Sequence, residues 1–193
     1  MQLDLDLWDA WHPAVVAERF AGVEVPWCVA AGWAIDLFLG AETRPHEDLE
    51  VAVPRPRFGE LAARLEGLEL YVPVGEGRLG PFDPGSESHQ TWVREPDGPW
   101  RLDVFREPAD GDTWICRRDA SIRMPYEELI ERTRDGIPYM RPDVVLLFKA
   151  KHAREKDDGD FDAALPRLDE SQRRSLRGWL ELVHPGHRWL ARL

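Results

Sequence analysis

The sequence has few cysteines, little positive charge and no long apolar run. Its 193 residues include two cysteines, Cys28 and Cys116, which lie far apart without Cys-x-x-Cys spacing, so we expect neither a disulfide framework nor a zinc site. No stretch approaches the roughly 18 apolar residues of a membrane span. The acidic N-terminus lacks the basic flank of a signal peptide. We therefore expect a cytoplasmic protein without a membrane partner.

Positive charge is outnumbered by negative charge. Lysine and arginine total 25 residues and aspartate and glutamate total 36, which gives a formal net charge of −11. Binding to a nucleic-acid backbone depends on clustered basic residues, so we expect no nucleic-acid partner. The surplus of acid favours a cationic or small-molecule partner. A chain of this length buries roughly 70% of its unfolded surface, and we expect one domain with a small helical annex.

The spacing of the apolar residues predicts an α+β protein. A mixed sheet comes first along the chain, and from Pro142 onward the pattern is helical. Helices are predicted at 5–20, 32–39, 57–66, 143–156, 158–165 and 170–183. Strands are predicted at 27–30, 48–53, 68–74, 90–94 and 100–106, and a loop at 75–88.

Three carboxylates on two predicted strands are the candidate chemical centre. Asp48 and Glu50 alternate with apolar residues and project from one face of their strand, with Cα atoms roughly 6.5–7 Å apart. Asp103 joins them if its strand, 100–106, pairs alongside. Carboxylates this close repel one another unless Mg²⁺ neutralises them, and the arrangement suits phosphoryl or nucleotidyl transfer. The alternative is an ordinary solvated strand face.

A turn upstream of the carboxylates is suited to a phosphate group. Ala31-Gly32-Trp33 lies where a strand passes into a helix, and backbone N–H groups at a helix N-terminus attract anions. Arg44 and His46 follow and offer further cationic or hydrogen-bonding groups to the same phosphate. For His46, two other roles stay open, which are ligation of a metal and a hydrogen bond to Asp48.

These segments together resemble a known family. The string Val29-Ala-Ala-Gly-Trp-Ala-Ile-Asp-Leu-Phe-Leu-Gly40, followed by Thr43-Arg-Pro-His-Glu-Asp-Leu-Glu50, is similar to the signature of the DNA polymerase beta-like nucleotidyltransferases. The similarity is closest to the branch with the aminoglycoside and lincosamide nucleotidyltransferases. It continues through Gly136-Ile-Pro-Tyr139 and Leu146–Lys151 to Lys156-Asp157, so it covers most of the chain. The motifs are specific in combination rather than singly.

The resemblance implies a fold, a reaction and a set of site residues. It implies a catalytic domain over 1–140, with a mixed sheet flanked by helices, and a helical module over 141–193 packed on it. The implied reaction transfers a nucleoside monophosphate, with ATP as the expected donor and two Mg²⁺ ions, to a hydroxyl of a small molecule such as an aminoglycoside-like antibiotic. Asp48, Glu50 and Asp103 would be catalytic and metal-binding, with Asp103 also a candidate general base. The implied nucleotide-binding residues are Ala31, Gly32, Trp33, Arg44, His46, Lys149 and Lys151.

The positions of two lysines and one aspartate leave more than one role open. Lys151 falls on the apolar face of the helix predicted from residue 143, where it either snorkels past the core or points into a cleft. The resemblance favours contact with nucleotide phosphates, and Lys149 lies at the margin of that face. Asp36 matches a position of the family and would either pair with Arg44 or cap a neighbouring segment.

Aromatic and acidic residues elsewhere have ordinary structural explanations. Trp92 and Trp100 are expected to pack in the core or at its rim rather than to stack on a base. The acidic run 157–160 lacks the pattern of a calcium loop and is expected to cap a helix.

Two departures from the family pattern leave other functions open. Ala31 stands where the family has glycine, and its methyl group lies where the backbone approaches a phosphate and requires a positive φ. Glu50 is one methylene longer than aspartate. The alternatives are a catalytically lapsed, antitoxin-like binding protein and an enzyme that modifies a protein hydroxyl. We expect a monomer or a homodimer.

Overall fold

A computed structural model describes residues 3–193, and it shows a mixed sheet of eight strands with a second, three-stranded sheet beside it. The large sheet has the order β10-β11-β1-β2-β6-β5-β3-β4. Its strands are β1 (Cys28–Val29), β2 (Glu50–Pro54), β3 (Glu69–Gly75), β4 (Arg78–Pro81), β5 (Gln90–Arg94), β6 (Trp100–Glu107), β10 (Ile130–Arg132) and β11 (Pro138–Met140). The small sheet contains β7 (Ala109–Asp110), β8 (Thr113–Ile115) and β9 (Arg123–Pro125).

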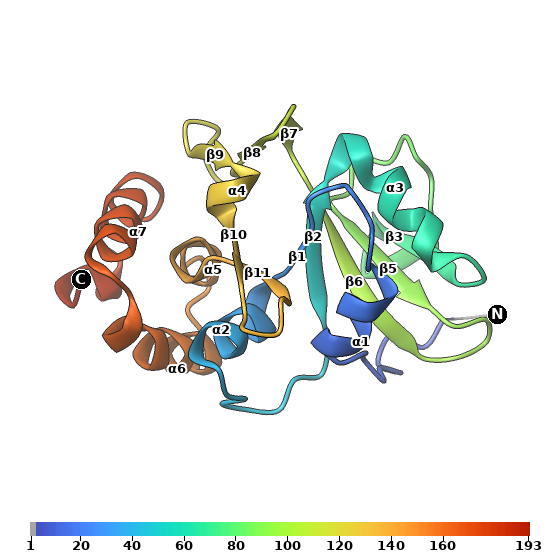
Figure 1. Cartoon of the computed structure of the whole chain (residues 1–193), viewed down its shortest axis with the longest axis horizontal. Helices are drawn as coiled ribbons and strands as arrows, with labels where there is room; N and C mark the ends of the chain where they lie inside the picture. The colour runs from blue at the N-terminus through green and yellow to red at the C-terminus, as the bar shows by residue number, and fades with distance from the viewer. Residues whose placement is uncertain (1–2) are drawn as a thin grey trace.

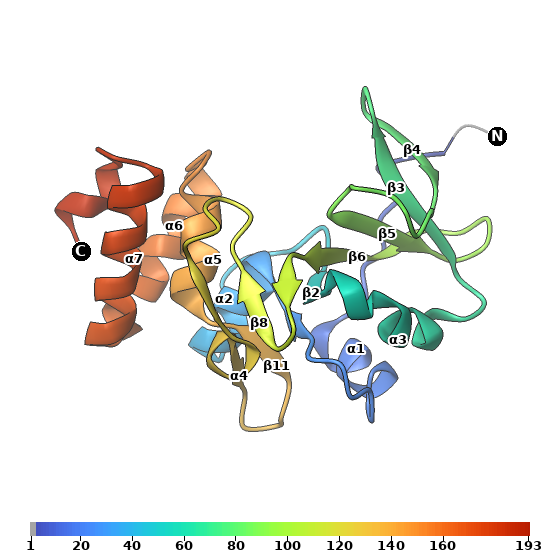
Figure 2. The ribbon, with the colours of Figure 1, turned by 90° about the horizontal axis from the view of Figure 1, so that it is seen from above.

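Helices flank the large sheet. They are α1 (Pro13–Arg19), α2 (Ala31–Leu39), α3 (Phe58–Ala62), α4 (Tyr126–Leu129), α5 (Pro142–Lys149), α6 (Glu155–Ala164) and α7 (Glu170–Val183), and short 3₁₀ turns occupy Arg55–Arg57, Ala63–Leu65, Leu165–Arg167 and Arg188–Ala191. Figure 1 shows α5, α6 and α7 gathered with the C-terminus at one end, and α1 and α3 beside the strands at the other. Figure 2 shows β3 and β4 projecting from the sheet on the side of the N-terminus. No helix within residues 3–193 is both long enough and apolar enough to cross a bilayer.

The core lies where the alternating strands meet the helices. Leu49, Val51 and Val53 are fully buried, and so are Leu102 and Val104 on the neighbouring strand, as the period of two predicts. The opposite face was expected to be open, but Ala52 and Asp103 are buried there as well, so the prediction of a half-buried strand is wrong. Residues 144–147 of α5 are also buried, since this helix packs between α2 and α7. The α+β fold class predicted from the sequence is confirmed.

The helix predicted at 5–20 is wrong over its first half. Residues 7–11 run in an extended form along the start of β6, where the Trp100 amide donates to the carbonyl of Leu7 and the Asp9 amide to the carbonyl of Trp100. The helix begins only at Pro13, after His12 caps its first turn. Trp100 is buried and packs edge-on against Trp92, so the packing explanation for Trp100 is confirmed.

Two further predictions need correction. The helix predicted at 143–156 is broken, because α5 ends at Lys149 and Ala153 adopts a left-handed conformation (φ 41°) before α6 begins. The loop predicted at 75–88 contains β4, which returns from β3 through a turn that starts at Gly75. The small sheet and β10 and β11 were not predicted, because these strands are only two or three residues long and show no periodicity.

Candidate active site

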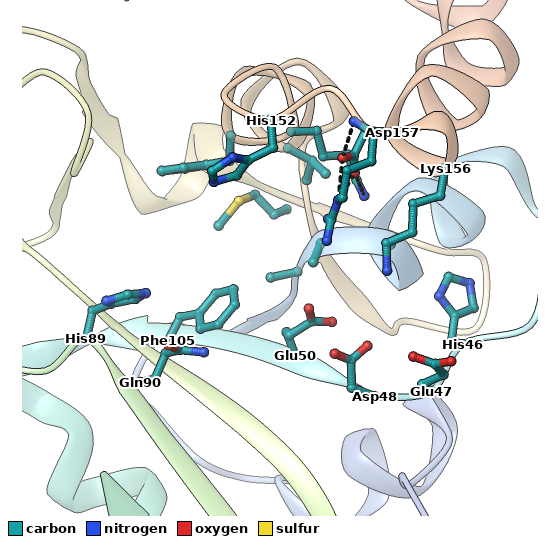
Figure 3. A pocket seen from close by; sticks show the side chains of 18 of the residues that line it. His46, Glu47, Asp48, Glu50, His89, Gln90, Phe105, His152, Lys156 and Asp157 are labelled. Atoms are coloured by element: carbon teal, nitrogen blue, oxygen red, sulfur yellow. Dashed lines mark hydrogen bonds and ion pairs between the residues drawn. The ribbon is translucent and has the colours of Figure 1, made fainter. Parts of the chain in front are cut away.

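A row of side chains crosses three adjacent strands of the large sheet. β2 and β6 are parallel neighbours, and their register places Glu50 beside Asp103. β5 lies antiparallel on the other side of β6, with Trp92 opposite Asp103. Partners in register project from the same face of a sheet, so the three side chains form one row. The prediction that the strand of Asp103 pairs beside that of Glu50 is confirmed. Asp48 lies just before β2, and Figure 3 shows its carboxylate next to that of Glu50.

Burial and like charge raise the pKa of two of these carboxyl groups. The pKa of Glu50 is raised to about 8, first by burial and then by the negative charges of Asp48 and Asp103. The pKa of Asp103 is raised to about 7, chiefly by burial. Asp103 Oδ2 accepts a hydrogen bond from Gln90 Nε2 (2.6 Å), whereas Asp103 Oδ1 is buried without a partner. A cation bound here would relieve both the repulsion and the unpaired oxygen.

The donor atoms of this row fit a hard divalent cation. Carboxylate oxygens are the ligands that Mg²⁺ prefers, and Asp48, Glu50 and Asp103 supply six of them. Within residues 3–193, no three His, Cys, Asp or Glu side chains are already gathered closely enough to hold a metal ion. Binding would therefore require these carboxylates to turn toward a common point.

The turn between β1 and α2 forms another wall of the site. Ala31 adopts φ 50°, which is the positive φ expected at this position. A Cβ built on Gly32 would lie 2.8 Å from His46 Cε1 and closer still to the Arg44 guanidinium. Glycine is therefore required here for these two side chains to lie against the turn.

A buried network fixes His46 in place. Asp36 is 3% exposed, accepts a hydrogen bond from Thr43 Oγ1 (2.5 Å) and lies 2.6 Å from His46 Nε2. Trp33 stacks on the imidazole with ring centroids 4.4 Å apart. Among the described residues, His46 makes no hydrogen bond to Asp48 and Asp36 makes none to Arg44, so both of those alternatives are wrong. Asp36 and Trp33 instead position His46.

Basic side chains lie on the side of the site that faces α5 and α6. Asp160 of α6 is buried and joins two of them, with Arg44 Nε 3.3 Å from its Oδ1 and Lys149 Nζ 2.6 Å from its Oδ2. Figure 3 shows Lys156 with its amino group directed toward Asp48 and Glu50. The predicted position of Lys151 on an apolar helix face is wrong, because α5 ends before it and its side chain is exposed.

These groups surround a cavity of about 710 Å³ between the sheet and the helices. Of the residues predicted for the site, those that line it are Ala31, Gly32, Arg44, His46, Asp48, Glu50 and Lys149. Those that do not are Trp33, Asp103 and Lys151. Trp33 stacks on His46, and Asp103 is buried between its register partners Glu50 and Trp92.

Sequence comparison finds a limited but specific likeness. A family model described as aminoglycoside-2''-adenylyltransferase matches residues 14–72. Curated 2''-aminoglycoside nucleotidyltransferases from Klebsiella pneumoniae and Escherichia coli are 46% identical to this chain over 44 residues. The matched stretch spans 23% of this chain and 25% of each relative.

Structural comparison extends the likeness to most of the chain. A solution structure of the antibiotic-resistance factor ANT(2'')-Ia has a TM-score of 0.56 at 18% identity and covers 88% of both chains. A crystal structure of ANT(2'')-Ia in complex with adenylyl-2''-tobramycin gives 0.55 at 18% identity, covering 86% of this chain and 93% of that one. The chain has a nucleotidyltransferase fold. The lincomycin-bound lincosamide adenylyltransferase LnuA gives 0.53 at 16% identity, covering 78% and 92%. The predicted resemblance to the aminoglycoside and lincosamide branch is confirmed.

The cavity also carries groups that sequence reasoning missed. Burial and the nearby guanidinium groups, Arg117 foremost, lower the pKa of His89 to about 4, so its ring is neutral near pH 7. Glu107 is buried and accepts a hydrogen bond from Arg117 Nε (3.0 Å). Besides Lys156, the missed polar lining residues include His89, Gln90, Glu107, Arg117, Arg118, His152 and Arg154. They come from the segment before β5, from β5 and β6, from the turn between β8 and β9, and from α6 and the junction before it. No motif by itself indicates that these residues reach the site.

Proposed function

We propose that this chain is a nucleotidyltransferase that transfers AMP from ATP to a hydroxyl group of an aminoglycoside-like antibiotic. The observation that carries the proposal is the row of Glu50 and Asp103 beside Asp48, in a cavity whose other wall is the turn at Gly32. The complex of ANT(2'')-Ia with adenylyl-2''-tobramycin supports AMP as the transferred group and an aminoglycoside as the acceptor.

The carboxylates and the cations would have separate tasks. Asp48, Glu50 and Asp103 would hold two Mg²⁺ ions, which neutralise phosphate charge and lower the pKa of an attacking hydroxyl. The Gly32 turn, together with Arg44, Lys149 and Lys156, would hold the triphosphate of ATP. Asp103, with its pKa raised toward 7, is suited to accept the proton of the acceptor hydroxyl. In-line attack needs little beyond this alignment and charge neutralisation.

The two parts of the chain would share this work. Residues 1–140 are proposed as the catalytic domain, and residues 141–193 as a helical module that supplies Lys149 and Lys156 to the cavity. We place the activity in the cytoplasm, where ATP is available, in a monomer or a homodimer.

Calorimetry with a non-hydrolysable ATP analogue tests the nucleotide site. Wild type should bind the analogue with Mg²⁺, and the double variant Asp48→Ala/Glu50→Ala should lose the metal-dependent part of its affinity, a change of about a hundredfold. The control is Asp135→Ala/Glu66→Ala, which also removes two carboxylates, both exposed and outside the cavity. Absence of binding by wild type to any nucleoside triphosphate would overturn the proposal.

A labelling assay tests the acceptor. With radiolabelled ATP, Mg²⁺ and tobramycin, label should appear on the antibiotic. Label on protein in a lysate would support modification of a protein hydroxyl instead. Label on neither, together with nucleotide binding, would support a lapsed enzyme that acts as a binding protein.

A further inference from the structure

A buried carboxylate of α6 contacts two of the cations that line the cavity. Asp160 is 3% exposed and does not line the cavity, whereas Arg44 and Lys149 both do. Arg44 comes from the segment between α2 and β2, and Lys149 is the last residue of α5. Because α6 packs against both α2 and α5, Asp160 connects two separate segments of the chain through one side chain.

Both oxygens of Asp160 take part in these contacts. Oδ1 accepts a hydrogen bond from Arg44 Nε (3.3 Å), and Oδ2 accepts one from Arg44 Nη2 (3.4 Å) and lies 2.6 Å from Lys149 Nζ. Arg44 Nη1 also donates to the carbonyl of Pro45 (3.2 Å), and Lys149 Nζ donates to Asp157 Oδ1 (3.3 Å). A guanidinium and an ammonium group carry more N–H donors than these contacts use, so both cations keep donors for a ligand in the cavity.

A role in forming α6 accounts for Asp157 but not for Asp160. Asp157 caps the helix, because its Oδ2 accepts hydrogen bonds from the backbone N (3.0 Å) and from Nε (2.9 Å) of Arg154. Asp160 lies inside the helix, and among the described residues its hydrogen bonds and ion pairs are all to Arg44 and Lys149. Burial of a charge is costly, and here the buried charge is paired only with cations of the cavity.

The Arg44–Asp160 pair also joins the two proposed parts of the chain. Arg44 belongs to residues 1–140 and Asp160 to residues 141–193, and within residues 3–193 this is the only ion pair that links one part to the other. Figure 3 shows Lys156 and Asp157, from the same helix as Asp160, across the cavity from Glu50. Two cations that share one carboxylate repel each other, and the negative charge between them offsets that repulsion.

We propose that Asp160 is a positioning residue, which holds Arg44 and Lys149 close together so that both contact the same triphosphate. This inference rests on the proposed function, in which these two cations bind the triphosphate of ATP. Long cationic side chains lose much rotamer freedom when they become ordered. Asp160 orders both of them before the nucleotide arrives, so less of that entropy is lost on binding. Asp160 itself does not touch the nucleotide.

Calorimetry with the non-hydrolysable ATP analogue and Mg²⁺ tests this role, because positioning and simple electrostatics predict opposite signs. Asp160→Asn removes a negative charge beside the triphosphate site, so an effect of charge alone would tighten binding. Loss of positioning should instead weaken binding by about tenfold, the equivalent of the rotamer freedom of one long side chain. Asp160→Glu keeps the charge but moves it by one methylene, and it should also weaken binding.

Two controls separate positioning from a general effect on the helix. Asp162→Asn removes the same charge from α6, but Asp162 pairs with Arg192 outside the cavity, so the affinity should change by less than about twofold. In a Lys149→Met background, Asp160→Asn should weaken binding less than it does in wild type, since one of its two partners is already gone. Urea denaturation without ligand shows which variants are folded.

The outcomes separate this inference from the proposed function. Weaker binding by Asp160→Asn and Asp160→Glu, with a smaller effect in the Lys149→Met background, supports positioning. Unchanged or tighter binding by Asp160→Asn, or an effect of equal size in that background, overturns it and leaves the nucleotide chemistry standing. If Asp160→Asn does not fold, the titration of Asp160→Glu decides by the same criterion. If wild type binds no nucleoside triphosphate, the proposed function is overturned and the role of Asp160 with it.

Discussion

Replacement of Ala31 by glycine should stabilise the protein, because Ala31 adopts a left-handed backbone conformation (φ 50°) at the start of α2. An L-residue with a Cβ pays roughly 1–2 kcal/mol for this conformation, and glycine does not. Glycine loses more backbone entropy on folding, which costs about 0.5–1 kcal/mol. The difference predicts that Ala31→Gly raises the free energy of unfolding by about 0.5 kcal/mol.

Thermal and urea denaturation measure this change. For a chain of this size, a gain of about 0.5 kcal/mol raises Tm by about 1–2 °C. Ala163→Gly is the matched control, since Ala163 lies within α6 and glycine in a helix costs about 1 kcal/mol. The two variants should therefore move Tm in opposite directions. A fall in Tm for Ala31→Gly as large as that of the control would refute the argument from strain.

The same substitution bears on the nucleotide site. Ala31 lines the cavity, and its methyl group stands where the family pattern has glycine. Ala31→Gly should therefore bind the ATP analogue at least as tightly as wild type, by the same calorimetry. Weaker binding would mean that the methyl group contacts the nucleotide favourably.

Three further variants test the surrounding geometry. Gly32→Ala should lower the free energy of unfolding by about 1–3 kcal/mol in urea denaturation and weaken ATP binding, because the new methyl group overlaps His46. A variant that behaves like wild type would show that the imidazole can move aside. Asp36→Asn should lower the free energy of unfolding by about 1–3 kcal/mol and raise KM for ATP, since Asp36 is buried against Thr43 and His46. An unchanged KM would contradict a positioning role for Asp36. In metal-free protein the pKa of Glu50 rises from 4.5 to about 8 on folding, so the folded state binds more protons and stability falls as pH rises from about 5 to 8. Asp103, whose pKa is raised to about 7, adds a slope of the same sign, so Glu50→Gln should reduce the slope without abolishing it and should exceed wild type by more than about 1 kcal/mol at pH 8. Equal slopes in the two proteins, by urea denaturation at pH 5 and 8, would contradict the shift.

The strands that carry the carboxylates could be predicted because apolar residues recur at every second position. Leu49, Val51 and Val53 share one face, as do Leu102 and Val104, so the placement of Glu50 and Asp103 together on the opposite face followed from the period of two. The burial of that opposite face, where Asp103 is only 5% exposed, could not be read from the pattern. The adjacency of the two strands is a long-range pairing. From the residues alone this pairing was only a condition, and the resemblance to the nucleotidyltransferases was what favoured it.

Other parts of the site could not be predicted from local pattern. Residues 5–12 have apolar residues at helical spacing, which predicts a helix. In the structure their backbone groups instead form hydrogen bonds with the start of β6, and this tertiary pairing overrides the local helix propensity. Lys151 was placed on a helix that ends two residues earlier, since the left-handed Ala153 turns the chain toward α6. Arg117 and Arg118 reach the cavity from a turn of the small sheet, and nothing in their own neighbourhood indicates that destination.

The order of strands in the large sheet sets when the site forms during folding. β1, which leads into the Gly32 turn, is hydrogen-bonded to β2 on one side and to β11 on the other, and Val29 has Tyr139 as its register partner. The strand before the turn is thus held against a segment 110 residues farther along the chain, a separation that slows folding. A nascent chain that has emerged only to residue 72 carries most of the family signature but neither β6, β11 nor α6. Such a chain contains the motif but not yet the cavity, because β6, β11 and α6 all contribute residues to its lining.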